Sequence, residues 1–206
     1  MRFPPLFILA LTGASFAFAD YRPELLFRED WQNTPAAQPV TQAHVANPDL
    51  ILHRLGPAEA SIKKSHHDTP SDDPYYIWSG PCEGNWAVAL EWRQGAFDLS
   101  NFAKVRWRSK QAGFRELRLI VKLASGEWLV ADQRDPASAD WRICEFNLKD
   151  LRWRELNIET VVEAEWVDHV DLSRVAQIGF TDLMRGARSL ACSRVDWIEV
   201  YAKAAK

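Results

Sequence analysis

Short segments of alternating apolar and polar residues, separated by turn residues, recur along the chain and constrain its fold more than any other feature. In the segment 104–109, Val105 and Trp107 would face one side of a strand, and Arg106 and Arg108 the other. Many short strands with turn residues between them predict an antiparallel sandwich or barrel. The predicted strands cover residues 25–31, 50–55, 75–79, 85–91, 104–109, 117–123, 128–132, 142–148, 175–180 and 194–201.

The segments between these strands are mostly short turns. Ser125-Gly126 separates two alternating segments and predicts a hairpin. Residues 157–165 are expected to form a short helix or an irregular connection. Two longer segments, 33–49 and 56–74, have no regular pattern, and such loops usually carry function or cover the edge of a sheet.

The amino terminus has the pattern of a secretory leader. Arg2 precedes a short apolar stretch at residues 6–11, and residues 17–19 have the small-x-small pattern of a cleavage site. The apolar stretch is shorter than the 20 or so residues that span a bilayer. We therefore predict a signal peptide at residues 1–19 and one β-sandwich domain at 20–206, with an uncleaved anchor as the alternative. The product would be exported to the periplasm or the extracellular space, without a membrane span.

Charge and motifs exclude several function classes. The chain has 206 residues with 25 basic and 28 acidic side chains, a formal charge of −3. A nucleic-acid partner is not expected, because such proteins carry an excess of Lys and Arg that displaces phosphate counterions. The sequence has no serine-hydrolase elbow, phosphate loop, dinucleotide fingerprint or zinc-protease motif. The oligomeric state stays open.

Three cysteines bear on the exported state. Export permits a disulfide, and an odd count leaves at least one thiol over. Cys144 lies in a predicted strand, whereas Cys82 and Cys192 lie in loop-like segments. A Cys82–Cys192 disulfide is therefore the favoured pairing if any forms, and three free thiols are the alternative. No cysteine spacing matches a zinc site.

The second half of the chain carries a family resemblance. Residues 97–108 open with Phe-Asp-Leu-Ser and continue as an alternating strand, residues 141–148 begin with Trp and end with Phe-Asn-Leu, and residues 170–180 and 192–200 read as a closing pair of strands. Over residues 97–201 these stretches resemble the galactose-binding-domain-like sandwiches found in many carbohydrate-binding modules. The resemblance implies an all-β, antiparallel jelly-roll β-sandwich. It also makes carbohydrate a common ligand among relatives, although a shared fold does not transfer a function.

One polar cluster could carry a site. Histidines and carboxylates crowd into residues 63–76, where they could bind a ligand, hold a metal or shuttle protons. A structural calcium on Asp68, Asp72 or Asp73 is chemically reasonable, although the calcium-loop pattern is absent. The alternative is a solvated loop with turns before its prolines. The candidate ligand-binding residues of this region are His66, His67, Asp68, Asp72, Tyr75, Tyr76 and Trp78.

The ten tryptophans suit sugar binding, because an aromatic face stacks on the apolar face of a pyranose. Trp153, between Arg152 and Arg154, is the most exposed candidate, with cation–π packing of the arginines as the alternative. The candidates for exposed stacking are Tyr75, Tyr76, Trp78, Trp86, Trp92, Trp128 and Trp153. The strand pattern places in the core Trp31, Trp107, Trp141 and Trp197.

Basic residues alternate along two consecutive predicted strands. Arg106 and Arg108 lie on one, and Arg118 and Lys122 on the next. If these strands pair, one sheet face carries a cationic stripe able to bind a sugar carboxylate or sulfate. The alternative is the solvated face of an amphipathic sheet.

These observations predict an exported, non-catalytic β-sandwich that binds a polysaccharide or glycan on exposed aromatics, without a cofactor. One alternative is a polysaccharide lyase or glycoside hydrolase on the same fold. In a lyase, Tyr75 or Tyr76 would exchange a proton with the sugar, His66 or His67 would act as base, and an arginine would neutralise a uronate. The other alternative is a structural or adhesion protein without a small ligand.

Overall fold

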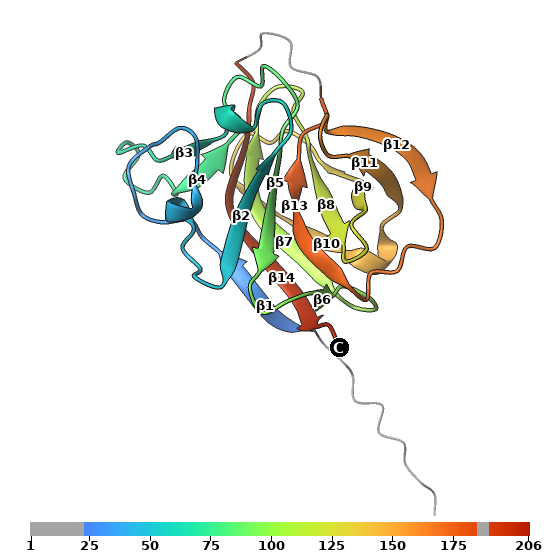
Figure 1. Cartoon of the computed structure of the whole chain (residues 1–206). Coiled ribbons are helices and arrows are strands. Elements are labelled where there is room, and N and C mark those ends of the chain that lie inside the picture. Colours follow the sequence, from blue (N-terminus) through green and yellow to red (C-terminus); the bar gives the residue numbers. More distant parts are fainter. Residues whose placement is uncertain (1–22, 185–189) are drawn as a thin grey trace, which may run out of the picture.

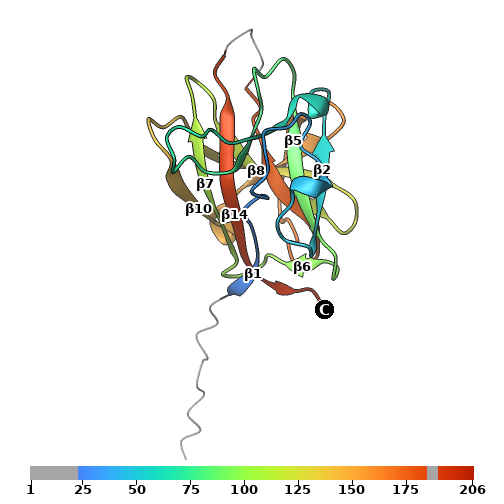
Figure 2. The ribbon, with the colours of Figure 1, turned by 90° about the vertical axis from the view of Figure 1, so that its left-hand side faces the viewer.

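The computed structural model describes residues 23–184 and 190–206, and the expected signal peptide lies outside them. The described part contains 14 strands and only short 3-10 helices, which confirms the all-β prediction with more strands than expected. The strands form the two layers of a sandwich, seen face-on in Figure 1 and edge-on in Figure 2.

We call the layer that faces the viewer in Figure 1 the front sheet. Its strand order is β2-β5-β13-β8-β9-β11-β12, with β6 beside β13. Its strands are β2 (Leu50–Leu55), β5 (Ala87–Trp92), β6 (Phe97–Asp98), β8 (Leu117–Leu123), β9 (Trp128–Asp135), β11 (Trp153–Asn157), β12 (Val162–Val167) and β13 (Val175–Thr181).

The other layer is the back sheet, with the order β10-β7-β14 followed by β1 and β4, which share the far side of β14. β3 pairs with β4 and forms the outer edge there. Its strands are β1 (Glu24–Glu29), β3 (Lys63–Ser65), β4 (Tyr76–Trp78), β7 (Lys104–Gln111), β10 (Arg142–Asn147) and β14 (Ser193–Ala204). The 3-10 helices are η1 (Gln42–His44), η2 (Glu59–Ser61) and η3 (Leu148–Asp150).

One strand joins the two layers. Most of β14 pairs with β7 in the back sheet, but its last residues, Lys203 and Ala204, pair with Asp98 and Phe97 of β6. Phe97 also pairs with Val175 of β13 in the front sheet. A single hydrogen-bonded network of strands therefore runs through both layers.

The core lies between the sheets and is built from the apolar side chains on the inward faces of the strands. In β7, buried and half-exposed residues alternate along the whole strand, as the sequence predicts. The Trp107 ring lies 4.6 Å from Phe146 and 6.0 Å from Phe180, which come from β10 and β13. Large apolar side chains from both layers thus meet at the centre, where burial stabilises each by about 1.5–3 kcal/mol.

A buried carboxylate also links the two layers through hydrogen bonds in this interior. Asp135, at the end of β9, accepts hydrogen bonds from Trp107 Nε1 and Gln111 Nε2, both at 2.8 Å, and from Ser109 Oγ. Arg142 Nε of β10 donates to its other oxygen at 3.0 Å. The front-sheet carboxylate is therefore tied to two strands of the back sheet.

The structure differs from the expected connections at residues 157–165 and 56–74, and it confirms the expected hairpin at Gly126. Residues 157–165 form neither a helix nor an irregular connection, because they provide the turn and part of the second strand of the β11–β12 hairpin. The segment 56–74 holds η2 and β3, and Lys64 of β3 also bridges to Ala37 of the first long segment. The hairpin around Gly126 forms as predicted, with that glycine at a positive φ of 110°.

All three cysteines are free thiols in this structure, which is the alternative to the favoured Cys82–Cys192 pairing. Both of these side chains are buried, and burial raises the pKa of each thiol. Cys144 is half-buried beside the core, and burial raises its pKa to about 11. Raised thiol pKa values leave all three mainly as unreactive thiols at neutral pH.

Candidate functional site

The dihistidine segment, residues 66–78, lies at the edge of the back sheet where β3 and β4 pair. His66 stacks on Tyr75, with ring centroids 4.0 Å apart and an angle of 17° between the planes. Asp68 and Asp72 are exposed. In the described part of the chain no group of three or more His, Cys, Asp and Glu side chains could hold a metal ion.

His67 and Tyr76 do come together, but not as an open site. His67 Nδ1 lies 2.9 Å from Asp73 Oδ2 and 3.2 Å from the Tyr76 hydroxyl. The Tyr76 ring packs on Trp141 at 5.4 Å and is only 2% exposed, so its prediction as an exposed stacking platform is wrong. Burial also raises the pKa of Tyr76, which makes the phenol a poorer proton donor.

The cationic stripe is a second wrong prediction. Arg106 and Arg108 lie on β7 in the back sheet, whereas Arg118 lies on β8 in the front sheet, so the two strands do not pair. Arg108 Nη1 is 2.7 Å from Asp196 Oδ2. Arg118 is buried, with Nη1 2.7 Å from Glu163 Oε2. These arginines form ion pairs with carboxylates of the protein itself. The stripe does not form because the consecutive strands β7 and β8 lie in different layers.

The tryptophan predictions are partly wrong. Trp31 and Trp107 are core residues as predicted, and Trp197 is buried beneath Arg28 at 4.4 Å. Trp141, expected in the core, is half-exposed. Of the candidates for exposed stacking, Tyr76, Trp86 and Trp153 are buried, and Tyr75, Trp78, Trp92 and Trp128 are half-exposed.

The arginines beside Trp153 contact a different tryptophan. Trp153 is 4% exposed and belongs to the core. The guanidinium carbons of Arg152 and Arg154 lie 4.2 and 4.5 Å from the ring centre of Trp166, which is 42% exposed. Trp166 pairs with Arg154 across β11 and β12, a cross-strand relation that spacing in the sequence did not reveal.

The outer face of the front sheet carries a line of polar and aromatic residues that we call the polar row: Glu91, Gln177, Lys122 and Trp128. They are successive partners across β5, β13, β8 and β9. Gln177 Nε2 donates to Glu91 Oε2 at 3.0 Å, and His53 Nε2 of β2 lies 2.8 Å from the same oxygen. Gln177 itself is buried, so the row presents the half-exposed Glu91 and Lys122 and ends at the half-exposed ring of Trp128.

A hollow of about 500 Å³ opens beside Trp128, and we call it the Trp128 hollow. Its volume is in the range of small-ligand sites. The hydroxyl of Ser125 lowers the pKa of Glu127, and that of Ser173 lowers the pKa of Asp171, so both carboxyls are ionised at neutral pH. The lining residues are Leu123, Glu127, Trp128, Leu129, Glu155, Leu156, Val167, His169, Val170 and Asp171.

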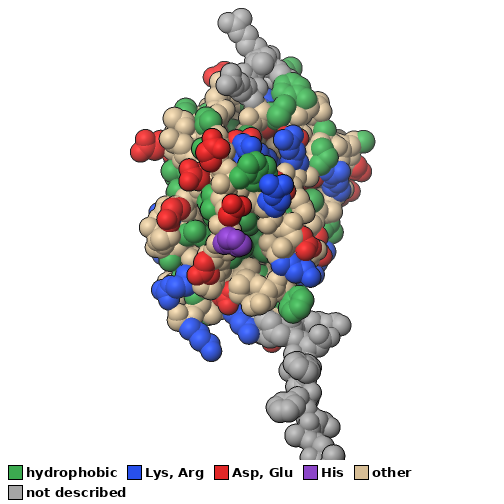
Figure 3. Space-filling model, turned by 90° about the vertical axis from the view of Figure 1, so that its right-hand side faces the viewer, with side chains coloured by type: hydrophobic (Ala, Val, Ile, Leu, Met, Phe, Trp, Pro, Cys, Tyr) green, Lys and Arg blue, Asp and Glu red, His purple; other side chains and the backbone are tan. Residues whose placement is uncertain are grey.

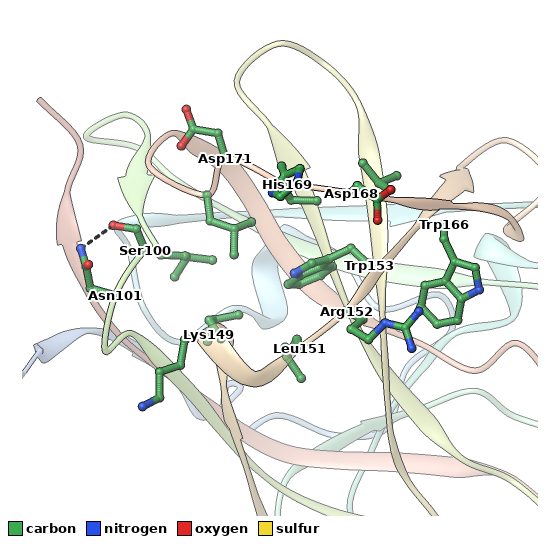
Figure 4. A pocket seen from close by; sticks show the side chains of 15 residues that line it. Ser100, Asn101, Lys149, Leu151, Arg152, Trp153, Trp166, Asp168, His169 and Asp171 are labelled. Atoms are coloured by element: carbon green, nitrogen blue, oxygen red, sulfur yellow. Dashed lines mark hydrogen bonds between the residues drawn. The ribbon is translucent and has the colours of Figure 1, made fainter.

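A second hollow, of about 430 Å³, is lined by all of residues 167–171, and four of them, Val167, His169, Val170 and Asp171, also line the Trp128 hollow. Figure 4 shows the Trp153 ring at its centre, with Asp168, His169 and Asp171 along one wall. On the opposite side the Arg152 guanidinium lies against the Trp166 ring. This hollow is therefore lined by both acidic and basic groups.

The surface over β11 and β12 has no dominant charge. Figure 3 shows acidic and basic side chains mixed with exposed hydrophobic ones across this side of the molecule. A strongly cationic surface for nucleic acid or sulfated polymer is absent from the face shown. The mixture of donors, acceptors and aromatic rings suits a ligand rich in hydroxyl groups.

Sequence reasoning found Trp128 as one candidate among several and missed its neighbours. Glu127 directly precedes Trp128, whereas Glu155 lies on β11 and His169 follows β12, and the pairing of β9 with β11 and of β11 with β12 brings these two near the ring. The sequence predicts no strand directly before Asp168 and His169, so it carries no signal for this part of the lining.

No family model matches this sequence. No curated protein matches it either. Among the described residues no helix has the length and apolar character needed to cross a membrane.

This chain is similar to several solved structures. A family 11 carbohydrate-binding module of a cellulosomal cellulase from Clostridium thermocellum is 13% identical, covering 88% of this chain and 95% of that one, with a TM-score of 0.46. A family 29 carbohydrate-binding module in complex with mannohexaose is 14% identical, covering 85% and 92%, with a TM-score of 0.47. An exo-β-agarase is 12% identical, covering 77% of this chain but 23% of that one, with a TM-score of 0.44.

These matches confirm the predicted resemblance to β-sandwich carbohydrate-binding modules. At this identity and TM-score they carry no argument about ligand, and the fold class stands on the strands described above. The protein is therefore an antiparallel β-sandwich in which the half-exposed Trp128 ends the polar row and lines the Trp128 hollow.

Proposed function

We propose that the protein is an exported carbohydrate-binding β-sandwich whose ligand lies along the polar row and stacks on Trp128. The observation that carries the proposal is the position of Trp128, which belongs both to the polar row and to the lining of a 500 Å³ hollow. An indole face covers much of a pyranose at little cost in side-chain entropy. Glu91 and Lys122, both half-exposed, would hydrogen-bond the hydroxyl groups, and the buried Gln177 would hold Glu91 in place.

Replacing this ring tests the site directly. Trp128→Ala should weaken sugar binding about tenfold, because losing an aromatic contact costs about 1–2 kcal/mol. The measurement is retardation in affinity gels containing mixed-linked β-1,3-1,4-glucan, mannan, or an acidic polysaccharide. Isothermal titration with cellohexaose and mannohexaose gives the affinity, and a thermal melt shows that the variant is folded.

Trp78→Ala is the matched control. Trp78 is also half-exposed, but it lies in the dihistidine segment, near Lys63 at 5.0 Å. It should leave retardation unchanged. Loss of binding in Trp78→Ala with full binding in Trp128→Ala would move the site to the dihistidine segment and overturn our placement.

The geometry favours binding over lyase chemistry. In a lyase the tyrosine must reach the sugar, but Tyr76 is buried and its hydroxyl contacts His67. Tyr75 is stacked on His66 and lies below Lys64, whose Nζ is 4.8 Å from the ring centre. Absorbance of an unsaturated product in the ultraviolet, after incubation with a uronate polymer, would contradict a purely binding role.

A further inference from the structure

The turn between β11 and β12, residues 158–161, folds over the outer face of the front sheet, and we call it the cover. Asn85, just before β5, donates from Nδ2 to the carbonyls of Thr160 and Val161 at 3.2 and 2.9 Å. Gly56, just after β2, approaches so closely that an added Cβ would lie 2.4 Å from Val161 Cγ2. The cover is thus fixed to the opposite edge of the sheet.

The cover is held in place by burial as well as by hydrogen bonds. Val161 is fully buried and packs with Ala87, Ile120, Val130 and Leu156 in a cluster separate from the main core. Its φ is 51°, an unfavourable conformation for a β-branched residue. Such a conformation persists only where the surroundings enforce it, so the cover is a fixed part of the fold.

The cover limits the width of the open face. The buried alanine, isoleucine and valine beneath it lie in the rows of the sheet next to the polar row. What stays half-exposed is Glu91, Lys122 and Trp128 of the polar row, together with His53, whereas Gln177 is buried. From β2 to β9 this strip crosses four strand spacings, about 19 Å, which is the length of a short oligosaccharide.

The strip also ends at Trp128. Beyond that ring lies the Trp128 hollow, and Val167, His169, Val170 and Asp171 line both this hollow and the second one, so their segment stands between the two. A ligand lying along the strip from the β2 side therefore meets a wall, and the hollow is the natural place for its last unit. A continuous chain would have to turn out of the hollow to continue.

The chemistry of the hollow suits a chain terminus. Glu127, Glu155 and Asp171 are exposed, and no Lys or Arg of the described residues forms an ion pair with them. Carboxylates accept hydrogen bonds from hydroxyl groups, and a terminal sugar offers one more free hydroxyl than an internal sugar. The same carboxylates would repel a uronate or sulfate.

We propose that the Trp128 hollow receives the terminal unit of a neutral sugar chain. The cover and residues 167–171 would keep a longer chain from continuing past the hollow. This inference rests on the proposed function and adds the class of ligand: chain ends rather than internal stretches. The neutral polysaccharide that retards the protein most serves as the probe, intact or partly hydrolysed, at equal sugar mass. Hydrolysis multiplies chain ends, so the hydrolysate should compete better, in proportion to the number of ends.

Two variants give a second readout. Glu155→Gln should weaken binding of cellohexaose or mannohexaose several-fold, whereas Glu165→Gln, exposed on β12 and outside the lining, should leave it unchanged. Equal competition by intact and hydrolysed polymer at equal mass would overturn the chain-end inference and leave the proposed function standing. Absence of binding to every sugar of the panel would overturn both.

Discussion

Lys64 is buried, and no carboxylate in the described part of the chain forms an ion pair with it. Its side chain is 1% exposed, and Nζ lies 3.3 Å from the carbonyl oxygen of Ser65 and 3.4 Å from that of Thr34. Burial lowers the pKa of this lysine from 10.5 to about 8. A carbonyl environment compensates only part of the lost hydration of an ammonium group.

Lys64 should make stability depend on alkaline pH. Between pH 8 and 10.5 the unfolded chain binds a proton at this lysine more readily than the folded protein does, so the free energy of unfolding rises with pH. Lys64→Met should remove this rise and stabilise the protein at neutral pH by about 1–3 kcal/mol. Urea denaturation at several pH values measures both effects.

The neighbouring lysine is the control for that experiment. Lys63 is half-exposed, with Nζ 5.0 Å from the Trp78 ring centre. Lys63→Met removes the same charge without removing a buried one. A pH slope in Lys64→Met equal to that of Lys63→Met and of the wild type would contradict the assignment to Lys64.

At the scale of elements, the side chain of Asp135 links β9 to the back sheet through hydrogen bonds. Its contacts with Trp107, Gln111 and Arg142 are all made in the interior or at its border. Asp135→Ala removes the acceptor of Trp107 Nε1 and the carboxylate that pairs with Arg142, and breaking a buried ion pair costs about 3–5 kcal/mol. The expected result is a lower urea midpoint with β7 and β10 exchanging amide hydrogens faster.

The control replaces an exposed acid. Glu165→Ala on β12 should change the free energy of unfolding by less than about 0.5 kcal/mol. If the two variants unfold at the same urea concentration, Asp135 does not hold the layers together.

Most strands could be predicted because one face of each meets the core. Strands β7, β8 and β9 appear in the sequence as alternating or apolar runs followed by turn residues. β3 was hidden because Lys64, a charged residue, occupies its buried position. β12 was missed because its six residues are exposed or half-exposed, so no apolar period marks them.

At the scale of the whole molecule, the site depends on which strands become neighbours. The sequence pattern indicates the faces of a strand but not its partner, and consecutive strands β7 and β8 went to different sheets. The predicted arginine stripe failed for that reason. The Trp128 hollow joins the β8–β9 turn, β11 and the segment after β12, so only the assembled sandwich reveals it.

Export is a property of the whole chain, and it can be measured on the product. If the leader is cleaved as proposed, the exported protein should begin at Asp20, and its intact mass should lack residues 1–19. Amino-terminal sequencing of protein from the periplasm or medium checks this. Recovery of the full-length chain from the membrane fraction would support the uncleaved anchor instead.

The strand shared by the two layers has a mechanical consequence. Tension applied at the carboxyl terminus would load β6 and β7 together, because β14 is bonded to both. Pulling β14 out would therefore disrupt strand pairing in both layers. In a single-molecule pulling experiment, the sandwich should rupture in one step rather than shed its strands one after another.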